Sequence, residues 1–269
     1  MAESFDPEEV ARFENETWSR CAEGYMDGFC RLLGQGVGPL LEAACVGAGH
    51  RVLDIGTGPG VVAREAAARG AEPVGLDFSE PMLSQARRLH PGLEFRHGAA
   101  EALPFDDGAF DAVVGNFVLH HSGEPDRVLG EAFRVVRPGG RMAFTVWADP
   151  RKLEAFGLFF SAVQEHAGAA ELPHGPLFGV SDFDTYHSMA RRAGFGDSQV
   201  RELEIAWLTP TIDSFLDAFR DWADLGAFPP AVREAIESTV RERAEAYRCG
   251  DGYSMPNPAI LVAAARPAA

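Results

Sequence analysis

Short apolar runs alternate, from residue 50 onward, with stretches in which apolar residues recur every three or four positions. The runs are typical of buried strands, and the recurring spacing is typical of helices that pack on a sheet. The runs that predict strands are RVLDI, EPVGLDF, LEFRHG, DAVVGNF, RMAFTVW, SQVRELEIAWL and PNPAILVAAARP. Strands that are apolar on both faces and are separated by helices form parallel sheets with helices on both sides. The pattern therefore predicts an α/β fold with a doubly wound, mostly parallel, seven-stranded sheet.

The first 45 residues predict helices outside this alternation. Aromatic residues recur there at near-helical spacing, among them Phe13, Trp18, Tyr25 and Phe29. Glycines at 34, 36 and 38 are expected to interrupt the helix, and a second short helix is expected to end at Gly47.

The pattern loosens after Trp147 but still predicts helices. One is expected over 151–168, and another begins at the capping-box spacing of Ser181–Asp184. Two more are expected over 211–225 and 229–248, between predicted strands. We therefore expect a single domain, with a helical cap at 1–45, a ligand-binding core at 46–150, a completion of the core at 151–208, a helical insertion that acts as a lid at 209–250, and a last strand at 251–269.

Charge and composition narrow the classes of partner. The chain has 24 Lys and Arg residues against 40 Asp and Glu residues, a net charge of −16. Such a surface repels phosphate backbones and anionic lipids, so we expect neither nucleic acid nor a membrane as partner. A small-molecule partner fits better, and a homo-oligomer remains compatible with the sequence.

The four cysteines are not paired as C-x-x-C, and neither they nor the histidines have metal-ligand spacing. We expect reduced thiols and no required metal. The N-terminal stretch MAESFDPEEV lacks the apolar segment of a secretory signal, and no apolar run approaches the roughly 20 residues of a membrane span. These features favour a cytoplasmic protein.

The most informative stretch is the glycine loop that follows the first predicted strand, VLDIGTGPG. A dinucleotide-binding loop has the spacing G-x-G-x-x-G and aims several N–H groups at a pyrophosphate. Here the spacing is G-x-G-x-G, and Pro59 removes one N–H donor. Asp54 stands two positions before Gly56, where a carboxylate repels phosphates and attracts an ammonium group. The loop therefore favours a cationic, phosphate-free nucleoside over NAD.

A second acid, Asp77, ends the next predicted strand, 23 residues after Asp54. Acids at about this offset bind the hydroxyls of a ribose. Either acid alone would be read as a loop carboxylate or a helix cap. Together with the intervening glycine loop, the two acids predict a nucleoside site.

Four stretches resemble the five motifs of the class I S-adenosylmethionine-dependent methyltransferases. They are VLDIGTGPG, GLDFSEPMLSQAR, AEALPFDDGAFDAVVGNFVLHH and RVVRPGGRMAFTVW. The chain is similar to the branch that includes ubiquinone, menaquinone and natural-product methyltransferases. The match is dense over residues 50–147, weaker to 208 and at the last strand, and poor elsewhere. The resemblance implies a Rossmann-like fold and S-adenosylmethionine as the cofactor.

The resemblance also implies roles for individual residues. The methionine part of the cofactor would be held by the backbone carbonyl of Asn116 and by the loop residues Asp54, Gly56, Thr57, Gly58 and Gly60. The ribose would bind Asp77, and the adenine would contact Phe78, Met82, Ala100 and Glu101. The family often has Gly-Asp-Ala-Glu where this chain has Gly98-Ala99-Ala100-Glu101. We therefore expect Glu101 or a backbone carbonyl to replace the acid that is missing at Ala99.

Other residues are candidates for the chemistry. His120 and His121 follow the fourth predicted strand, and either would serve as a general base near neutral pH. A structural or substrate-shaping role for them is an equal alternative. Tyr25 and Trp18 either close over the cofactor or belong to the core.

The sequence thus predicts methyl transfer to a small molecule, an apolar or aromatic biosynthetic intermediate methylated on O, C or N. Two alternatives remain open at this point. One is an S-adenosylmethionine-binding protein with other chemistry, such as a cyclisation, and the other is an NAD-dependent oxidoreductase.

Overall fold

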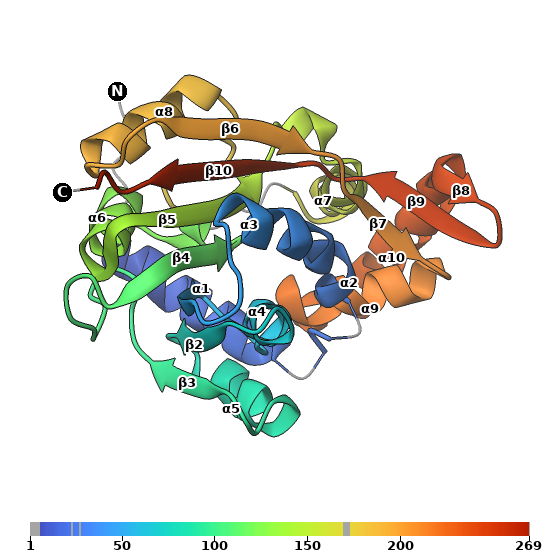
Figure 1. Cartoon of the computed structure of the whole chain (residues 1–269). Helices are drawn as coiled ribbons and strands as arrows, with labels where there is room; N and C mark the ends of the chain where they lie inside the picture. The colour runs from blue at the N-terminus through green and yellow to red at the C-terminus, as the bar shows by residue number, and fades with distance from the viewer. Residues whose placement is uncertain (1–5, 23, 27, 169–172, 269) are drawn as a thin grey trace.

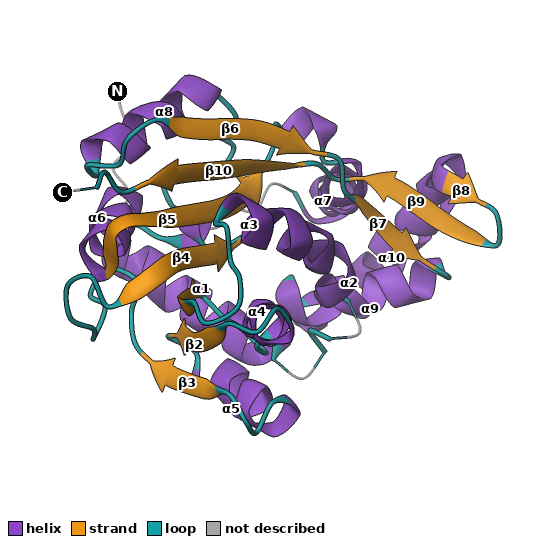
Figure 2. Cartoon of the chain, in the orientation of Figure 1, coloured by secondary structure: helices purple, strands orange, loops and turns teal. Residues whose placement is uncertain are grey.

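The computed structural model describes residues 6–22, 24–26, 28–168 and 173–268, and its centre is a seven-stranded sheet (Figures 1 and 2). The strand order is β3-β2-β1-β4-β5-β10-β6. The pairs from β3 to β5 are parallel, and β10 is antiparallel to both of its neighbours. The strands are β1 (Arg51–Ile55), β2 (Glu72–Asp77), β3 (Glu94–His97), β4 (Phe110–Asn116), β5 (Val136–Trp147), β6 (Ser198–Leu203) and β10 (Ala259–Ala265). This confirms the predicted doubly wound, mostly parallel sheet.

Helices cover both faces of the sheet because alternate side chains of each strand point to opposite sides. Val52 of β1 packs in one apolar cluster with α3 (Val37–Ala43), α4 (Val61–Ala68) and α7 (Glu154–Ala167). Its neighbour Leu53 packs in another cluster, with α6 (Pro125–Val135) and α8 (Phe183–Arg192). On α5 (Glu80–Leu89), the Ser79 hydroxyl caps the first turn by accepting a hydrogen bond from the Met82 N–H. These layers fix the carboxyl ends of the parallel strands at one edge.

The predicted strand over 198–208 is wrong as a single element. It divides into β6 and β7 (Ala206–Thr209), and β7 joins a second sheet with the order β7-β9-β8. The other strands of that sheet are β8 (Arg248–Cys249) and β9 (Gly252–Pro256). The side chain of Gln35 binds both backbone groups of Ala206, at 2.8 Å and 3.3 Å, which draws this part of the chain away from β10.

Three other boundaries also differ from expectation. Gly34–Gly36 form a turn of 3-10 helix that continues α2 (Phe29–Leu33) into α3, so the glycines do not break the helix. β5 begins at Val136, with a register shift opposite β4, whereas the run RMAFTVW predicted a strand that starts only at Arg141. The N-cap of α8 is Asp182, not Ser181.

The helices outside the sheet differ in which part of the core they pack in. α9 (Ile212–Trp222) and α10 (Pro230–Ala244) contribute to the large apolar cluster that also contains residues of the sheet. α1 (Pro7–Cys21) lies beside α9 (Figure 1), but none of its residues belongs to that cluster, and two of the four residues that it buries, Glu14 and Thr17, are polar. The helices described within the predicted 209–250 lid therefore pack in the main core, whereas α1 packs outside it.

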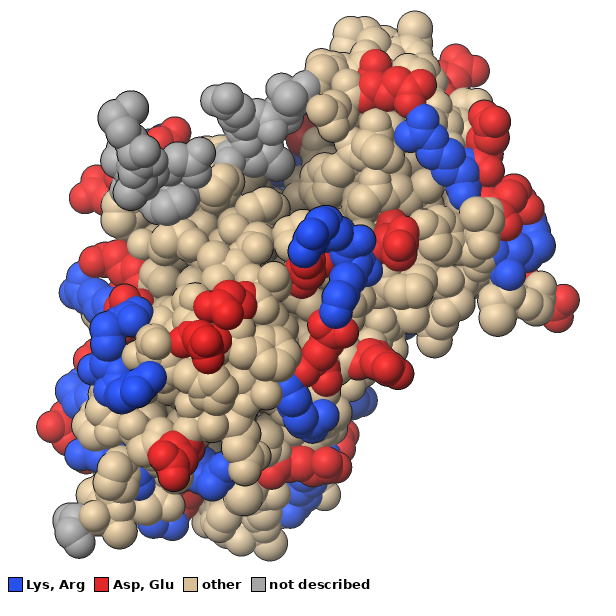
Figure 3. Space-filling view, turned by 90° about the horizontal axis from the view of Figure 1, so that it is seen from above, with Lys and Arg blue, Asp and Glu red and all other residues tan. Residues whose placement is uncertain are grey.

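The surface mixes charges of both signs. On the face seen in Figure 3, basic and acidic side chains are interspersed. Within the described ranges, no helix has the length and apolar character needed to cross a bilayer.

Candidate functional site

The glycine loop between β1 and α4 adopts a backbone that side chains would not allow. Gly56, Gly58 and Gly60 have φ values of 64°, 52° and 85°, in the left-handed region that favours glycine. A Cβ on Gly56 would also lie 2.5 Å from Val118 Cγ2. A ligand at this loop can therefore approach bare backbone.

Asp54 lies beneath the loop, and within the described ranges only one of its two carboxylate oxygens accepts a hydrogen bond. Its side chain is 1% exposed, and the Thr57 hydroxyl donates to Oδ2 at 2.6 Å. Its other oxygen, Oδ1, has no partner among the described residues. Burial raises the pKa of Asp54 from 3.8 to about 7. A buried acceptor without a partner is costly, and a cationic group of a ligand would satisfy it.

Asp77 connects the end of β2 to the glycine loop. The Gly58 N–H donates to Oδ2 at 2.8 Å, and the Ser79 N–H donates to Oδ1 at 2.9 Å. Burial raises the pKa of this carboxyl as well. Each carboxylate oxygen can accept a second hydrogen bond, so Asp77 can hold the loop and still receive two hydroxyls.

A cavity of about 960 Å³ opens at this edge of the sheet. Nine of the sequence-predicted site residues line it: Tyr25, Gly56, Gly58, Asp77, Phe78, Met82, Asn116, His120 and His121. Asp54, Thr57 and Gly60 do not line it and support the loop from behind. The structure thus brings most of the predicted residues to one cavity.

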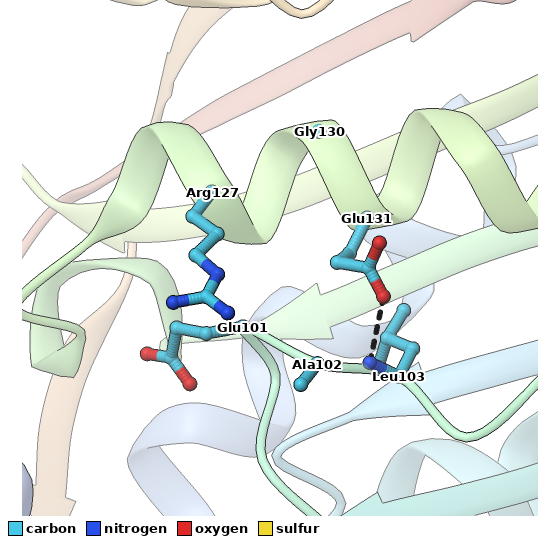
Figure 4. A pocket seen from close by; sticks show the side chains of 6 residues that line it. All are labelled: Glu101, Ala102, Leu103, Arg127, Gly130 and Glu131. Atoms are coloured by element: carbon cyan, nitrogen blue, oxygen red, sulfur yellow. Dashed lines mark hydrogen bonds between the residues drawn. The ribbon is translucent and has the colours of Figure 1, made fainter.

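Ala100 and Glu101 are not among the residues that line this cavity. Glu101 accepts a hydrogen bond from the Ser122 hydroxyl. It lies at a separate, open depression of about 430 Å³ between its own loop and α6, where Figure 4 shows it beside Arg127. The structure gives no support to Glu101 as the replacement for the acid missing at Ala99.

Asn116 ends β4, and both ends of its side-chain amide are hydrogen-bonded within the protein. Its Nδ2 donates to the Leu33 carbonyl at 3.0 Å, and its Oδ1 accepts from the Thr145 hydroxyl at 2.7 Å. The next residue, Phe117, has a φ of 57° and donates its N–H to the Thr145 hydroxyl at 2.9 Å. The amide of Asn116 therefore helps to fix the chain where it lines the cavity.

The two candidate histidines have different surroundings. His120 is 4% exposed, and neither ring nitrogen has a partner among the described residues. Burial and the neighbouring His121 lower the pKa of His120 well below its usual value. His121 Nδ1 lies 2.9 Å from Glu14 Oε1, and Trp18 Nε1 donates to Glu14 Oε2 at 2.9 Å.

Glu14 was missed by the sequence analysis. An acid on an exposed-looking amphipathic helix is usually a solvated charge, and no local signal connects it to a histidine after the fourth strand of the sheet. The spacing of Glu14 and Trp18, four residues apart, is the only feature that places the two on one face of a helix.

Aromatic rings dominate the part of the cavity away from the glycine loop. The Trp147 ring lies 4.1 Å from that of Phe117 and 4.8 Å from that of Phe156, between centroids. The further rings that line the cavity are those of Phe13, Trp18, Phe29, Phe160, His174, Phe178 and Trp222, of which Trp18 and Trp222 pack on the cluster that contains Met82. The described residues that line the whole cavity include no lysine and no arginine.

Comparisons with known proteins agree with this geometry. Residues 53–144 match the family described as Methyltransferase domain. Over 170 residues the chain is 37% identical to a demethylmenaquinone methyltransferase of Clavibacter sepedonicus. The aligned stretch covers 58% of this chain and 69% of that protein. Over 137 residues it is 36% identical to a malonyl-[acyl-carrier protein] O-methyltransferase of Erwinia billingiae, which covers 50% of this chain and 53% of that protein.

Among solved structures, the YcgJ protein of Bacillus subtilis matches with a TM-score of 0.59 at 19% identity, covering 88% of this chain and 100% of that one. This likeness concerns the fold. The 37% identity to the relative from Clavibacter sepedonicus indicates, in addition, that the two proteins share a common ancestor. The resemblance drawn from the motifs is confirmed, and with it methyl transfer and S-adenosylmethionine as the methyl donor. The chain belongs to the class I S-adenosylmethionine-dependent methyltransferases.

Proposed function

We propose that this enzyme methylates an uncharged, ring-bearing small molecule that binds in the aromatic part of the 960 Å³ cavity. The observation that carries the proposal is the division of that cavity. One end has the glycine loop and Asp77, and the other end is formed by aromatic rings without a basic side chain among the described residues. The first end suits the methyl donor, and the second suits an apolar acceptor.

The residues at the loop fit S-adenosylmethionine. Asp54 places a carboxylate directly behind the loop, where it favours the ammonium group of the methionine part, and Gly56 and Gly58 offer that part bare backbone to contact. Asp77 has lone pairs left for the ribose hydroxyls, while Phe78, Met82 and Tyr25 offer apolar contacts for the adenine. The bound cofactor supplies a methyl group that is already activated by the sulfonium. The task of the protein is therefore mainly to orient the partners and to exclude water.

Charge at the acceptor end selects against anions. The acids Asp6, Glu9 and Glu14 line the cavity, and no described lysine or arginine compensates for them there. A carboxylate or phosphate acceptor would be repelled and left without a partner. Neutral His120, with both ring nitrogens free, can donate and accept one hydrogen bond each, and would orient a polar group on the acceptor ring.

The cover of the cavity is formed by the described part of the N-terminal segment, and above all by α1. Trp18 and Tyr25 line the cavity from this segment, with ring centroids 6.0 Å apart. Cys21 and Ala22 pack on Met82. Because α1 lies outside the large apolar cluster to which α9 and α10 belong, we assign to it the opening that admits the acceptor.

The proposal is tested with a panel of acceptors. The purified enzyme is incubated with S-adenosylmethionine and with neutral phenols and quinols, demethylmenaquinone, aromatic carboxylates and phosphate esters. Products are identified by mass spectrometry, and S-adenosylhomocysteine is quantified. We expect methylated product from neutral ring compounds only.

Two outcomes would contradict the proposal. Methylation restricted to anionic acceptors would refute the charge argument. Conversion of an acceptor without formation of S-adenosylhomocysteine would show chemistry such as a cyclisation. A thermal-shift control compares S-adenosylhomocysteine with NAD, which the loop should not bind because Pro59 lacks an N–H.

A further inference from the structure

Glu14 of α1 is a buried carboxylate that joins two rings of the cavity wall. It is 7% exposed, and its two oxygens lie 2.9 Å from His121 Nδ1 and 2.9 Å from Trp18 Nε1. Trp18 Nε1 can only donate, and an ionised carboxylate can only accept. His121 Nδ1 must therefore carry its hydrogen toward Glu14. In the neutral ring this leaves the lone pair on Nε2.

The second nitrogen of His121 remains available. The His121 side chain is 20% exposed and lines the cavity, and no hydrogen bond joins Nε2 to the part of the chain that the structure describes. His120, whose ring centroid lies 4.1 Å away, has no carboxylate beside it. Of the two rings, only His121 is held in one tautomer by a charged partner.

We propose that Glu14 is a positioning residue that holds His121 Nε2 as the base for an acceptor hydroxyl, so that the acceptor is a phenol-like compound methylated on oxygen. The inference rests on the proposed function and narrows its substrate class. In the reaction the acceptor O–H bond breaks, its proton goes to Nε2, and its electron pair stays on oxygen. That oxygen forms the bond to the methyl carbon as the methyl–sulfur bond breaks, and the pair of that bond returns to sulfur. The proton is later released to water.

The arrangement also connects chemistry with closure. Glu14 belongs to the segment proposed as the cover, whereas His121 belongs to the turn after β4. The carboxylate that fixes the tautomer is therefore present only when α1 is docked. Besides Glu14 and His121, the titratable groups that line the cavity are Asp6, Glu9, Tyr25, Asp77, His120 and His174.

The first test reads the tautomer directly. The full-length protein is labelled with ¹⁵N-histidine, and the ring resonances of His121 are assigned with a His121→Asn variant. We expect a protonated Nδ1 and an unprotonated Nε2. In Glu14→Gln the amide oxygen can still accept from Trp18, so its NH₂ faces Nδ1 and the hydrogen moves to Nε2. Glu16→Gln, an exposed site on the same helix, is the matched control and should keep the wild-type tautomer.

The second test asks whether the base acts on a hydroxyl. 4-Nitrophenol is added to the protein saturated with S-adenosylhomocysteine, at one pH unit below the midpoint of its own ionisation. We expect phenolate absorption above that of free 4-nitrophenol at the same pH with the wild type and with Glu16→Gln, and loss of this excess with Glu14→Gln. In turnover with a phenol acceptor, Glu14→Gln should lower kcat by about 100-fold with little change in KM.

A hydrogen on Nε2 in the wild type, or a tautomer unchanged in Glu14→Gln, would overturn the proposal. A phenolate band that is absent with the wild type, or equal in Glu14→Gln, would do the same. These readouts need no methyl transfer. If the tautomer and the phenolate band are as expected but no acceptor is methylated, the proposed function fails and the dyad stands.

Discussion

Replacing Asp77 with asparagine separates its contact with the ribose from its support of the glycine loop. In the wild type each carboxylate oxygen accepts one backbone N–H, from Gly58 at 2.8 Å and from Ser79 at 2.9 Å. The lone pairs that remain can accept two ribose hydroxyls. Asparagine has one oxygen and an NH₂ group that cannot accept, so one backbone N–H and at least one hydroxyl lose their partner.

The magnitude follows from these counts. A hydrogen bond to a charged acceptor contributes about 1.5–3 kcal/mol. Since about 1.4 kcal/mol corresponds to a factor of ten, S-adenosylhomocysteine should bind about 10- to 150-fold more weakly to Asp77→Asn. The orphaned N–H should lower the free energy of unfolding of the ligand-free protein by about 1–3 kcal/mol.

The assay is a thermodynamic cycle measured by isothermal titration calorimetry. Wild type and Asp77→Asn are titrated with S-adenosylhomocysteine and with its 2′,3′-dideoxy analogue. The wild type should lose most of its affinity when the hydroxyls are removed, and the variant should lose much less. Asp126→Asn, which removes an exposed carboxylate paired with Arg192 at 2.7 Å, should bind as the wild type does. An equal loss in both proteins would show that Asp77 does not contact the ribose.

Three further predictions concern the loop, its buried acid and its cover. Because the pKa of Asp54 is about 7 in the fold and near 3.8 when unfolded, the folded state holds a proton that the unfolded state lacks between these values, so stability should fall as pH rises from about 4 to 7. Denaturant titrations should show this fall in the wild type and a smaller one in Asp54→Asn, where the buried Asp77 remains, and equal slopes would refute it. Gly56→Ala should abolish cofactor binding and lower Tm, because the new Cβ would lie 2.5 Å from Val118 Cγ2 and the residue has a φ of 64°. Gly92→Ala is the control, since no atom of the described residues beyond its chain neighbours lies within 4 Å of the position of its Cβ. Unimpaired binding by Gly56→Ala would refute the argument from backbone strain. In hydrogen exchange, the backbone amides of α1 should be less protected than those of α9 and α10, and their exchange should slow when S-adenosylhomocysteine is added. Uniform protection of the three helices would show that α1 is a fixed part of the core.

The sequence predicted best what is local along the chain. Asp54, the glycine loop and Asp77 fall within a single strand–loop–helix–strand unit, so spacing alone places them together. Glu14 and His121 meet only because α1 folds over the turn after β4, and no periodicity records that contact. The break between β6 and β7 was equally hidden, because apolar and polar residues keep alternating through it while the pairing partner changes from β10 to β9.

The chain passes from the large sheet to the small one and back through two adjacent stretches, 203–205 and 257–259, which we call the neck. The neck has a consequence for how such an enzyme diversifies. Leu203, the last residue of β6, pairs with Ala259, the first residue of β10, so the chain leaves the large sheet and returns to it at one step of the ladder. The Asn257 N–H closes the same neck by donating to the Ile205 carbonyl at 2.9 Å. A segment whose ends lie side by side can be exchanged for another with little change in the cost of closing the chain. Residues 204–258 can therefore change in length without disturbing the ladder of the large sheet, provided that Trp207 and Phe219 keep their ring contacts with Phe29. Because Trp222 is the one residue of this segment in the described lining of the cavity, such changes leave the half of the chain that binds the methyl donor unaltered.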